Sequence, residues 1–139
     1  MTWLLDTCAL SDFARGEPGT LRRLKAVHPS AVAVSAITVM EVEYGLLLAE
    51  SRAKTLGPVV RAVLGAVVIL PYTAEDARAS ASLRAALEKK GRPIGAYDVL
   101  IAGAALSRGL MLVTSNVREF GRISGLRVEN WRAVAQSRR

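Results

Sequence analysis

Four carboxylates in this chain each border a segment of apolar or small residues. They are Asp6, Glu41, Asp98 and Glu119. Acids that gather in one place repel one another unless a cation neutralises them, and the hard ions Mg²⁺ and Mn²⁺ prefer oxygen ligands. If the fold brings these four together, the sequence predicts a divalent metal site that acts on phosphates.

Each acid also has a purely structural interpretation. Asp6 follows an apolar run and can cap the next helix. Thr38 and Glu41 have the spacing of a capping box, and on local grounds capping is favoured over chemistry for Glu41. Asp98 can be a first-turn acid, which the helix dipole stabilises by ~0.3–1 kcal/mol. Its apolar flanks favour a paired or ion-bound carboxylate, since a buried charge without a partner costs free energy. The residues alone leave both interpretations open.

Other familiar chemistries find no support in the sequence. The only histidine is His28 and the only cysteine is Cys8, which disfavours zinc and any serine or cysteine triad. No glycine-rich phosphate loop follows a strand-like segment. A single cysteine cannot form an internal disulfide, so a reducing cytoplasm is the expected location.

Size and composition indicate one compact domain. The chain has 139 residues, of which 51% are hydrophobic and 5% aromatic. Its longest apolar stretch, 62–70, is far shorter than the ~18–20 residues that span a membrane, and no basic segment precedes the first strand, so neither a membrane segment nor a signal peptide is expected. The net charge of +7 indicates a polyanionic partner such as nucleic acid, or a merely solvated basic surface.

Apolar patterning predicts an alternation of strands and helices. The expected strands are 3–5, 31–34, 67–70 and 111–114, with a short fifth at 126–128. The expected helices are 8–15, a second one capped by Thr20, 37–49, 52–64, 74–90 and 96–108. Pro58 lies inside 52–64, so this segment is either one helix or two. Such alternation predicts a parallel sheet covered by helices on both faces, with Asp6 and Asp98 at the carboxyl rim.

Several motifs together resemble a known family. They are Leu4-Leu5-Asp6-Thr7, then 35–41 with Tyr44-Gly45, then Pro93-Ile94-Gly95 to Asp98 with Ile101-Ala102, then 113–120, and finally 125–131. In this order and spacing they resemble the PIN-domain ribonuclease toxins of VapBC toxin–antitoxin pairs. Each motif alone is weak, but the resemblance spans nearly the whole chain.

The resemblance implies both a fold and a site. The fold is a three-layer α/β/α domain over residues 1–132, with strand order 3-2-1-4-5, followed by a basic tail, 133–139, that we expect to fray. Asp6, Glu41, Asp98 and Glu119 become metal-binding and catalytic acids for Mg²⁺ or Mn²⁺. Thr7, Thr114 and Asn116 become supporting polar residues. The resemblance thereby reverses the local preference for Glu41 as a cap.

It also implies a function and partners. The function is metal-dependent endonucleolytic cleavage of RNA, often a tRNA or rRNA loop. The partners are a VapB-like antitoxin and a second toxin chain, with a homodimer or a larger toxin–antitoxin assembly as the expected form. One departure stands out, because the family usually has Asn where this chain has Cys8. This substitution keeps open a catalytically silent nucleic-acid or antitoxin binder. A phosphomonoesterase with Asp6 as nucleophile is disfavoured, because such enzymes need a second Asp two residues later, and here that position is Cys8.

Overall fold

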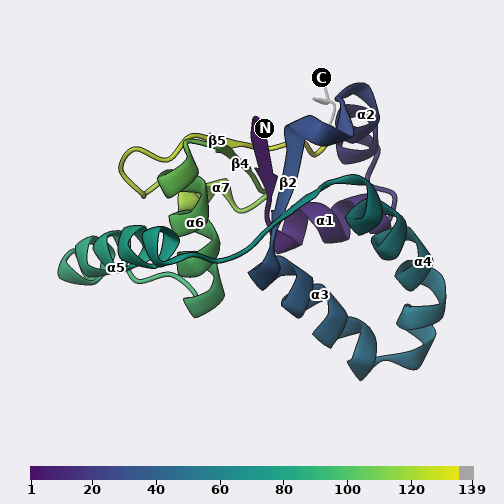
Figure 1. The fold of residues 1–139 in the computed structure, drawn as a ribbon, viewed down its shortest axis with the longest axis horizontal. Coiled ribbons are helices and arrows are strands. Elements are labelled where there is room, and N and C mark those ends of the chain that lie inside the picture. Colours follow the sequence, from purple (N-terminus) through teal and green to yellow (C-terminus); the bar gives the residue numbers. More distant parts are fainter. Residues whose placement is uncertain (135–139) are drawn as a thin grey trace, which may run out of the picture.

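The structure is a computed structural model that describes residues 1–134, and its centre is a five-stranded parallel sheet. The strands are β1 (Trp3–Leu5), β2 (Val32–Ser35), β3 (Val68–Leu70), β4 (Met111–Val113) and β5 (Val128–Glu129). Their order is β3-β2-β1-β4-β5, and every neighbouring pair is parallel. The predicted order is confirmed, with β1 at the centre between β2 and β4 (Figure 1).

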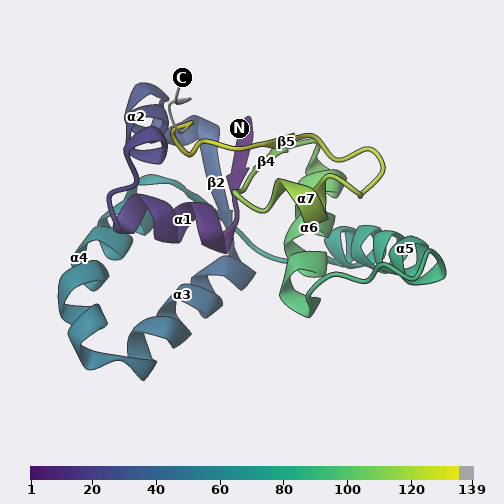
Figure 2. The same ribbon diagram turned by 180° about the vertical axis from the view of Figure 1, so that it is seen from behind.

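Helices connect the strands and surround the sheet. They are α1 (Thr7–Ala14), α2 (Pro18–Ala26), a short 3-10 turn at Pro29–Ala31, α3 (Ala36–Leu48), α4 (Glu50–Ala66), α5 (Ala74–Lys89), α6 (Ala96–Arg108) and α7 (Val117–Phe120). In Figures 1 and 2, α3 and α4 extend together away from the sheet and α1 runs across their open end. The α5 and α6 helices lie on the other side of the molecule.

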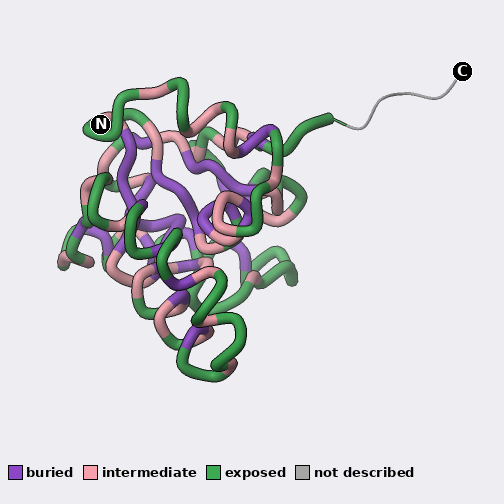
Figure 3. The backbone as a smooth tube through the Cα atoms, turned by 90° about the vertical axis from the view of Figure 1, so that its right-hand side faces the viewer, coloured by how far each residue is buried: buried purple, intermediate pink, exposed green. Residues whose placement is uncertain are grey.

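Alternate residues of the strands build a core on each face of the sheet. Leu4, Ala33 and Leu112 are fully buried against α5 and α6. Leu5 and Val34 are buried on the opposite face with residues of α1 and α2. The buried segments accordingly run through the middle of the molecule in Figure 3. Burial on both faces explains why the strands read as unbroken apolar runs. The three-layer α/β/α prediction is confirmed.

The structure corrects or completes the expected bounds of two helices and one strand. The second helix is not capped by Thr20 but begins at Pro18, because Glu17 accepts the Thr20 N–H at 2.7 Å and proline at the first position has no N–H to leave unpaired. The α4 segment is one helix that continues through Pro58. The fifth strand lies at Val128–Glu129, slightly later than expected.

The chain after β5 is bound to the first two helices. Arg132 donates to the Asp12 carboxylate at 2.8 and 2.9 Å, and the Ala133 N–H donates to Glu17 at 3.0 Å. Trp131 is 3% exposed and packs edge-on against Trp3, with ring centroids 5.8 Å apart. Residues 135–139, most of the tail expected to fray, lie outside the described residues, and the domain limits stay a prediction. Within residues 1–134, no helix is long and apolar enough to cross a membrane.

A buried carboxylate, Asp76, ties the start of α5 to the end of α6. It is 1% exposed and accepts hydrogen bonds from the Thr73 N–H at 2.9 Å, from the Ser107 hydroxyl and from Arg108 at 3.1 Å. Burial alone would raise the pKa of Asp76, but these three donors lower it below its usual value. The ionised form is therefore the one that the fold stabilises.

We predict that Asp76→Ala lowers the free energy of unfolding by about 2–4 kcal/mol near neutral pH, because it removes the buried carboxylate that Arg108, Ser107 and the Thr73 N–H share and leaves the Arg108 charge without its ion-pair partner. Since the folded-state pKa of Asp76 is lowered, its contribution is complete above the unfolded pKa of ~3.9 and is lost as the pH falls below it. Denaturant unfolding of wild type and variant at pH 7 and pH 3 measures both effects. The exposed neighbour variant Glu75→Gln is the control, and a difference below about 0.5 kcal/mol for Asp76→Ala would refute this role.

Candidate functional site

Asp6 lies at the end of the central strand with almost no contact with water. Its side chain is 1% exposed, and Oδ1 accepts the Ala9 N–H at 2.7 Å as the N-cap of α1. Burial raises the pKa of Asp6 to about 6, although the Thr114 hydroxyl and the Ala9 N–H act in the opposite direction and the charge of Asp98 adds to the rise. The capping interpretation is therefore correct, but capping does not satisfy this carboxylate fully.

Glu41 faces α1 and does not form the capping box that its spacing suggested. The α3 helix begins earlier, at Ala36, and its cap is Ser35, whose hydroxyl accepts the Ile37 N–H at 3.1 Å. Thr38 is therefore inside the helix and fully buried. With the cap filled by Ser35, the Glu41 carboxylate is free to accept a hydrogen bond from the Thr7 hydroxyl at 2.5 Å.

Asp98 lies in the first turn of α6, with its carboxylate folded back over Gly95. Burial raises the pKa of Asp98, and the negative charges of Glu41 and Glu119 raise it further. The helix dipole alone would have the opposite effect on the pKa of a first-turn acid. Asp98 thus lies in the combined field of two other acids, which come from α3 and α7.

The other two predicted polar residues and the fourth acid follow β4. Thr114 is 1% exposed and its hydroxyl accepts the Asn116 N–H at 2.9 Å, which fixes the turn into α7. Asn116 holds the N-cap position of α7 without a side-chain cap bond. Glu119 lies on α7 at 40% side-chain exposure, 4.0 Å from Arg122. This short helix had no counterpart among the expected elements.

The fold brings the four acids to one rim of the sheet. Asp98 is electrostatically coupled to each of the other three. Within residues 1–134, however, no three side chains of the metal-binding types already stand close enough to enclose an ion. The donor set offers oxygen atoms from carboxylates, from hydroxyls and from the Asn116 amide, and oxygen is the ligand that a hard divalent ion prefers.

Two residues near this rim escaped the sequence reasoning. Thr38 accepts a hydrogen bond from the Thr7 hydroxyl at 3.3 Å, so it belongs to the Thr7–Glu41 contact. Asp12 is 7% exposed, pairs with Arg132 and adds to the raised pKa of Asp6. A signal was present for Asp12, since an acid next to Phe13 on the inner face of a short helix needs a partner. That partner lies 120 residues away in the sequence.

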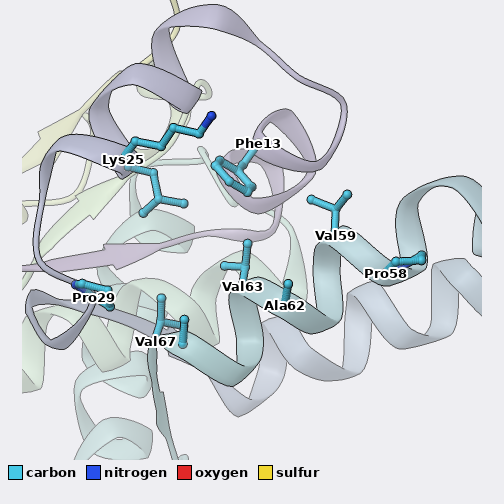
Figure 4. A pocket seen from close by; sticks show the side chains of 10 residues that line it. Phe13, Lys25, Pro29, Pro58, Val59, Ala62, Val63 and Val67 are labelled. Atoms are coloured by element: carbon cyan, nitrogen blue, oxygen red, sulfur yellow. The ribbon is translucent and has the colours of Figure 1, made fainter.

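Two hollows lie beside α1. One is apolar, about 520 Å³, and is formed by α1, α2 and α4, with Phe13, Val59, Val63 and Val67 among its lining residues and Lys25 at its edge (Figure 4). It contains none of the four acids. The other is smaller, about 90 Å³, lies between α1, α3 and α4, and includes Thr7 and Glu41 in its lining.

Comparison with known proteins agrees with this geometry. The PIN domain family model matches residues 3–126. The chain is 37% identical over 131 residues to the tRNA(fMet)-specific endonuclease VapC of Salmonella typhimurium, and 34% identical to the protein of the same name from Shigella flexneri. Each match covers 94% of this chain and 98% of the relative. The chain belongs to the VapC group of PIN-domain proteins.

A solved structure of a VapC-type complex shares the fold. The PIN domain described here matches a chain of the DNA-bound VapBC complex from Salmonella typhimurium with a TM-score of 0.86 and 37% identity, covering 94% of this chain and 98% of the other. The family resemblance of the sequence is thereby confirmed. The roles of the individual acids in this PIN domain are a separate matter and rest on their geometry.

We predict that Asp98→Asn does not destabilise the metal-free PIN domain. Because burial and the neighbouring acids both raise the pKa of Asp98, its ionised form opposes folding near neutral pH, and a neutral amide relieves both costs. Thermal unfolding in EDTA at pH 7 should show an unchanged or higher melting temperature. A clear fall would mean that Asp98 serves the fold as an ordinary first-turn acid.

Proposed function

We propose that this protein is a divalent-metal-dependent endoribonuclease that acts as the toxin of a type II toxin–antitoxin pair. The observation that carries the proposal is the arrival of four acids at one edge of the sheet, from the end of β1 and from α3, α6 and α7, where burial and the neighbouring acids raise the pKa of Asp98. Acids so placed are costly to the fold without a cation. The names of the relatives, endonuclease and ribonuclease, support the same reaction.

The metal ligands we propose are Asp6 and Asp98, with Glu41 and Glu119 completing the acidic set. A bound Mg²⁺ or Mn²⁺ would supply a water of lowered pKa and positive charge for the phosphate. Residues of the chain itself position the acids. Ala9 and Thr114 hold the Asp6 carboxylate at the end of β1. The Thr7 hydroxyl orients Glu41, and Asn116 starts α7, which carries Glu119.

The substrate we propose is RNA. The basic character of the chain, +7 overall, favours a polyanion around an acidic centre. Transfer RNA is the first class to test, because two relatives are named as specific for tRNA(fMet); ribosomal RNA is the second. We place the protein in the cytoplasm, where both occur.

The partners we propose are a VapB-like antitoxin and a second copy of this chain. The similar Salmonella structure is a VapBC complex bound to DNA, which supports a toxin–antitoxin assembly here. The acidic rim suits an Arg or Lys supplied by the antitoxin. A homodimer is supported by the end of α3, where Tyr44, Leu47 and Leu48 are 59%, 85% and 67% exposed. Such an apolar cluster is unusual on a surface that faces only water.

We predict that purified protein cleaves tRNA in Mn²⁺ or Mg²⁺ to leave 5′-phosphate ends, and that EDTA abolishes cleavage. Asp98→Asn should reduce the rate by at least ~100-fold, since even changes to residues behind metal ligands cost ~10–100-fold. Its Mn²⁺ affinity, measured by calorimetry, should fall in parallel. The surface variant Glu75→Gln is the control. Undiminished cleavage in excess EDTA would exclude the proposed chemistry.

A silent binder is the second candidate, and Cys8 is the observation that favours it. Cys8 follows Thr7 in α1 and is exposed as a residue, but partial burial of its sulfur, together with the charge of Asp6, raises the pKa of the thiol to about 11. It is therefore neutral and bonds weakly where the family usually has an amide. If this departure is tolerated, the acids still support turnover.

We predict that Cys8→Asn keeps or raises the cleavage rate, because an amide can hydrogen bond to neighbouring groups that a neutral thiol leaves weakly satisfied. The same cleavage assay, with Cys8→Ala as the matched control, measures the effect. A wild type without cleavage in Mn²⁺ that gains it in Cys8→Asn would identify the natural protein as the silent binder. A large loss in Cys8→Asn would show that the thiol itself has a role.

A further inference from the structure

The small hollow between α1, α3 and α4 continues from the proposed site toward two arginines. Thr7 and Glu41 line one end of it, and Arg15 and Arg52 line it as well. Eight residues of helix separate Thr7 from Arg15, which amounts to ~12 Å along α1. The hollow therefore leads from the acids to positive charge. Its volume, about 90 Å³, is comparable to that of a few water molecules and suits a phosphate group better than a base.

Arg15 and Arg52 are exposed and unpaired within the part of the chain that the structure describes. Six other arginines of residues 1–134 form ion pairs, namely Arg23, Arg61, Arg84, Arg108, Arg122 and Arg132. What sets Arg15 and Arg52 apart from the remaining unpaired arginines is that they line the hollow that also contains Glu41. Two guanidinium groups that form no ion pair lie in one hollow and remain available for an external anion, and the planar guanidinium matches phosphate oxygens well.

Gly45 supplies an independent observation. It lies inside α3, one turn after Glu41, and lines the same hollow. A glycine inside a helix is unfavourable compared with alanine. Here neither packing nor backbone conformation requires it, because its φ is not positive and a Cβ would meet nothing within 4 Å. The missing side chain leaves the wall of the hollow open, as a closely approaching ligand backbone would need.

We propose that this hollow is a phosphate subsite for the RNA strand, on the Glu41 side of the acids. Arg15 and Arg52 contact backbone phosphates beyond the point of cleavage, and Gly45 lets the strand pass close to α3. The inference rests on the proposed function and adds a direction for the bound strand. Val42, Leu46, Leu56 and Val60 also line this hollow, but it holds the charged side chains of Arg15, Glu41 and Arg52. The apolar hollow of Figure 4 has Lys25 as its single charged lining residue, so it suits a protein segment better.

The first test measures RNA binding without cleavage. Fluorescence anisotropy of a labelled short single-stranded RNA of mixed sequence is recorded in EDTA, with Asp98→Asn as the background so that nothing is cut. Arg15→Gln and Arg52→Gln should each weaken binding about 5–10-fold, and each should lower the slope of log affinity against log salt by ~0.7. Arg78→Gln, which removes an equally exposed charge on α5, is the matched control and should change affinity less than twofold.

The second test uses a pair of glycines. Gly45→Leu should raise or keep the melting temperature but weaken RNA binding at least fivefold. Gly65→Leu is the matched control, since Gly65 is also helical with nothing near its Cβ but lies on α4 outside the hollow. It should stabilise the protein and leave RNA binding unchanged.

The outcomes separate this inference from the proposed function. Normal RNA binding by the double variant Arg15→Gln/Arg52→Gln overturns the subsite, even if the wild type cleaves RNA. Loss of affinity for a VapB-like antitoxin, with RNA binding intact, assigns the hollow to the protein partner and also overturns it. If the wild type does not cleave RNA in Mn²⁺ but both arginine substitutions still weaken RNA binding, the subsite is supported and only the proposed nuclease activity is refuted.

Discussion

A carboxylate that has lost nearly all contact with water must be stabilised by hydrogen bonds or by a cation, and Asp6 is held in that position by the centre of the sheet. It ends β1, the strand with neighbours on both sides, and its side chain is 1% exposed. One N–H and one hydroxyl approach it, yet its pKa remains raised. The rest of the rim adds charge of the same sign. Asp98, Glu41 and Glu119 arrive from three different helices, each of which starts at the same edge of the sheet.

The parallel sheet explains why these acids meet. All five strands point the same way, so every strand end and every following helix start lies at one edge. The strand order brings three of the acids close together along this edge. The β1 strand lies between β2 and β4, and the segments that follow these three strands carry Asp6, Glu41 and Glu119. Two ion pairs connect segments outside the sheet. Asp76 joins the start of α5 to the end of α6 through Arg108, and Asp12 joins α1 to the segment after β5 through Arg132. These contacts keep the helices in the positions from which the acids converge.

The convergence of the four acids on one metal site stays a prediction, and the strand order came from the resemblance to the family. The sequence itself predicted the strands well, because apolar runs and helix breakers are local signals. It failed where distant groups decide. The spacing of Glu41 from Thr38 suggested a cap, but Ser35, three residues earlier, caps the helix. The Glu41 carboxylate instead accepts a hydrogen bond from Thr7, which lies on another helix. From the sequence, Pro58 left open whether this segment forms one helix or two, and in the structure α4 continues through it. Asp12 could not be paired with Arg132, and Arg15 could not be placed beside Arg52, because only the tertiary fold brings these residues together.

We propose that the four acids form one site for a hard divalent ion. Crystals of the protein soaked in Mn²⁺ and measured at the manganese absorption edge would locate that ion. We expect an anomalous peak at the carboxyl rim, within ~2.0–2.6 Å of oxygens of Asp6 and Asp98. An occupied manganese position elsewhere, with none at this rim, would contradict it.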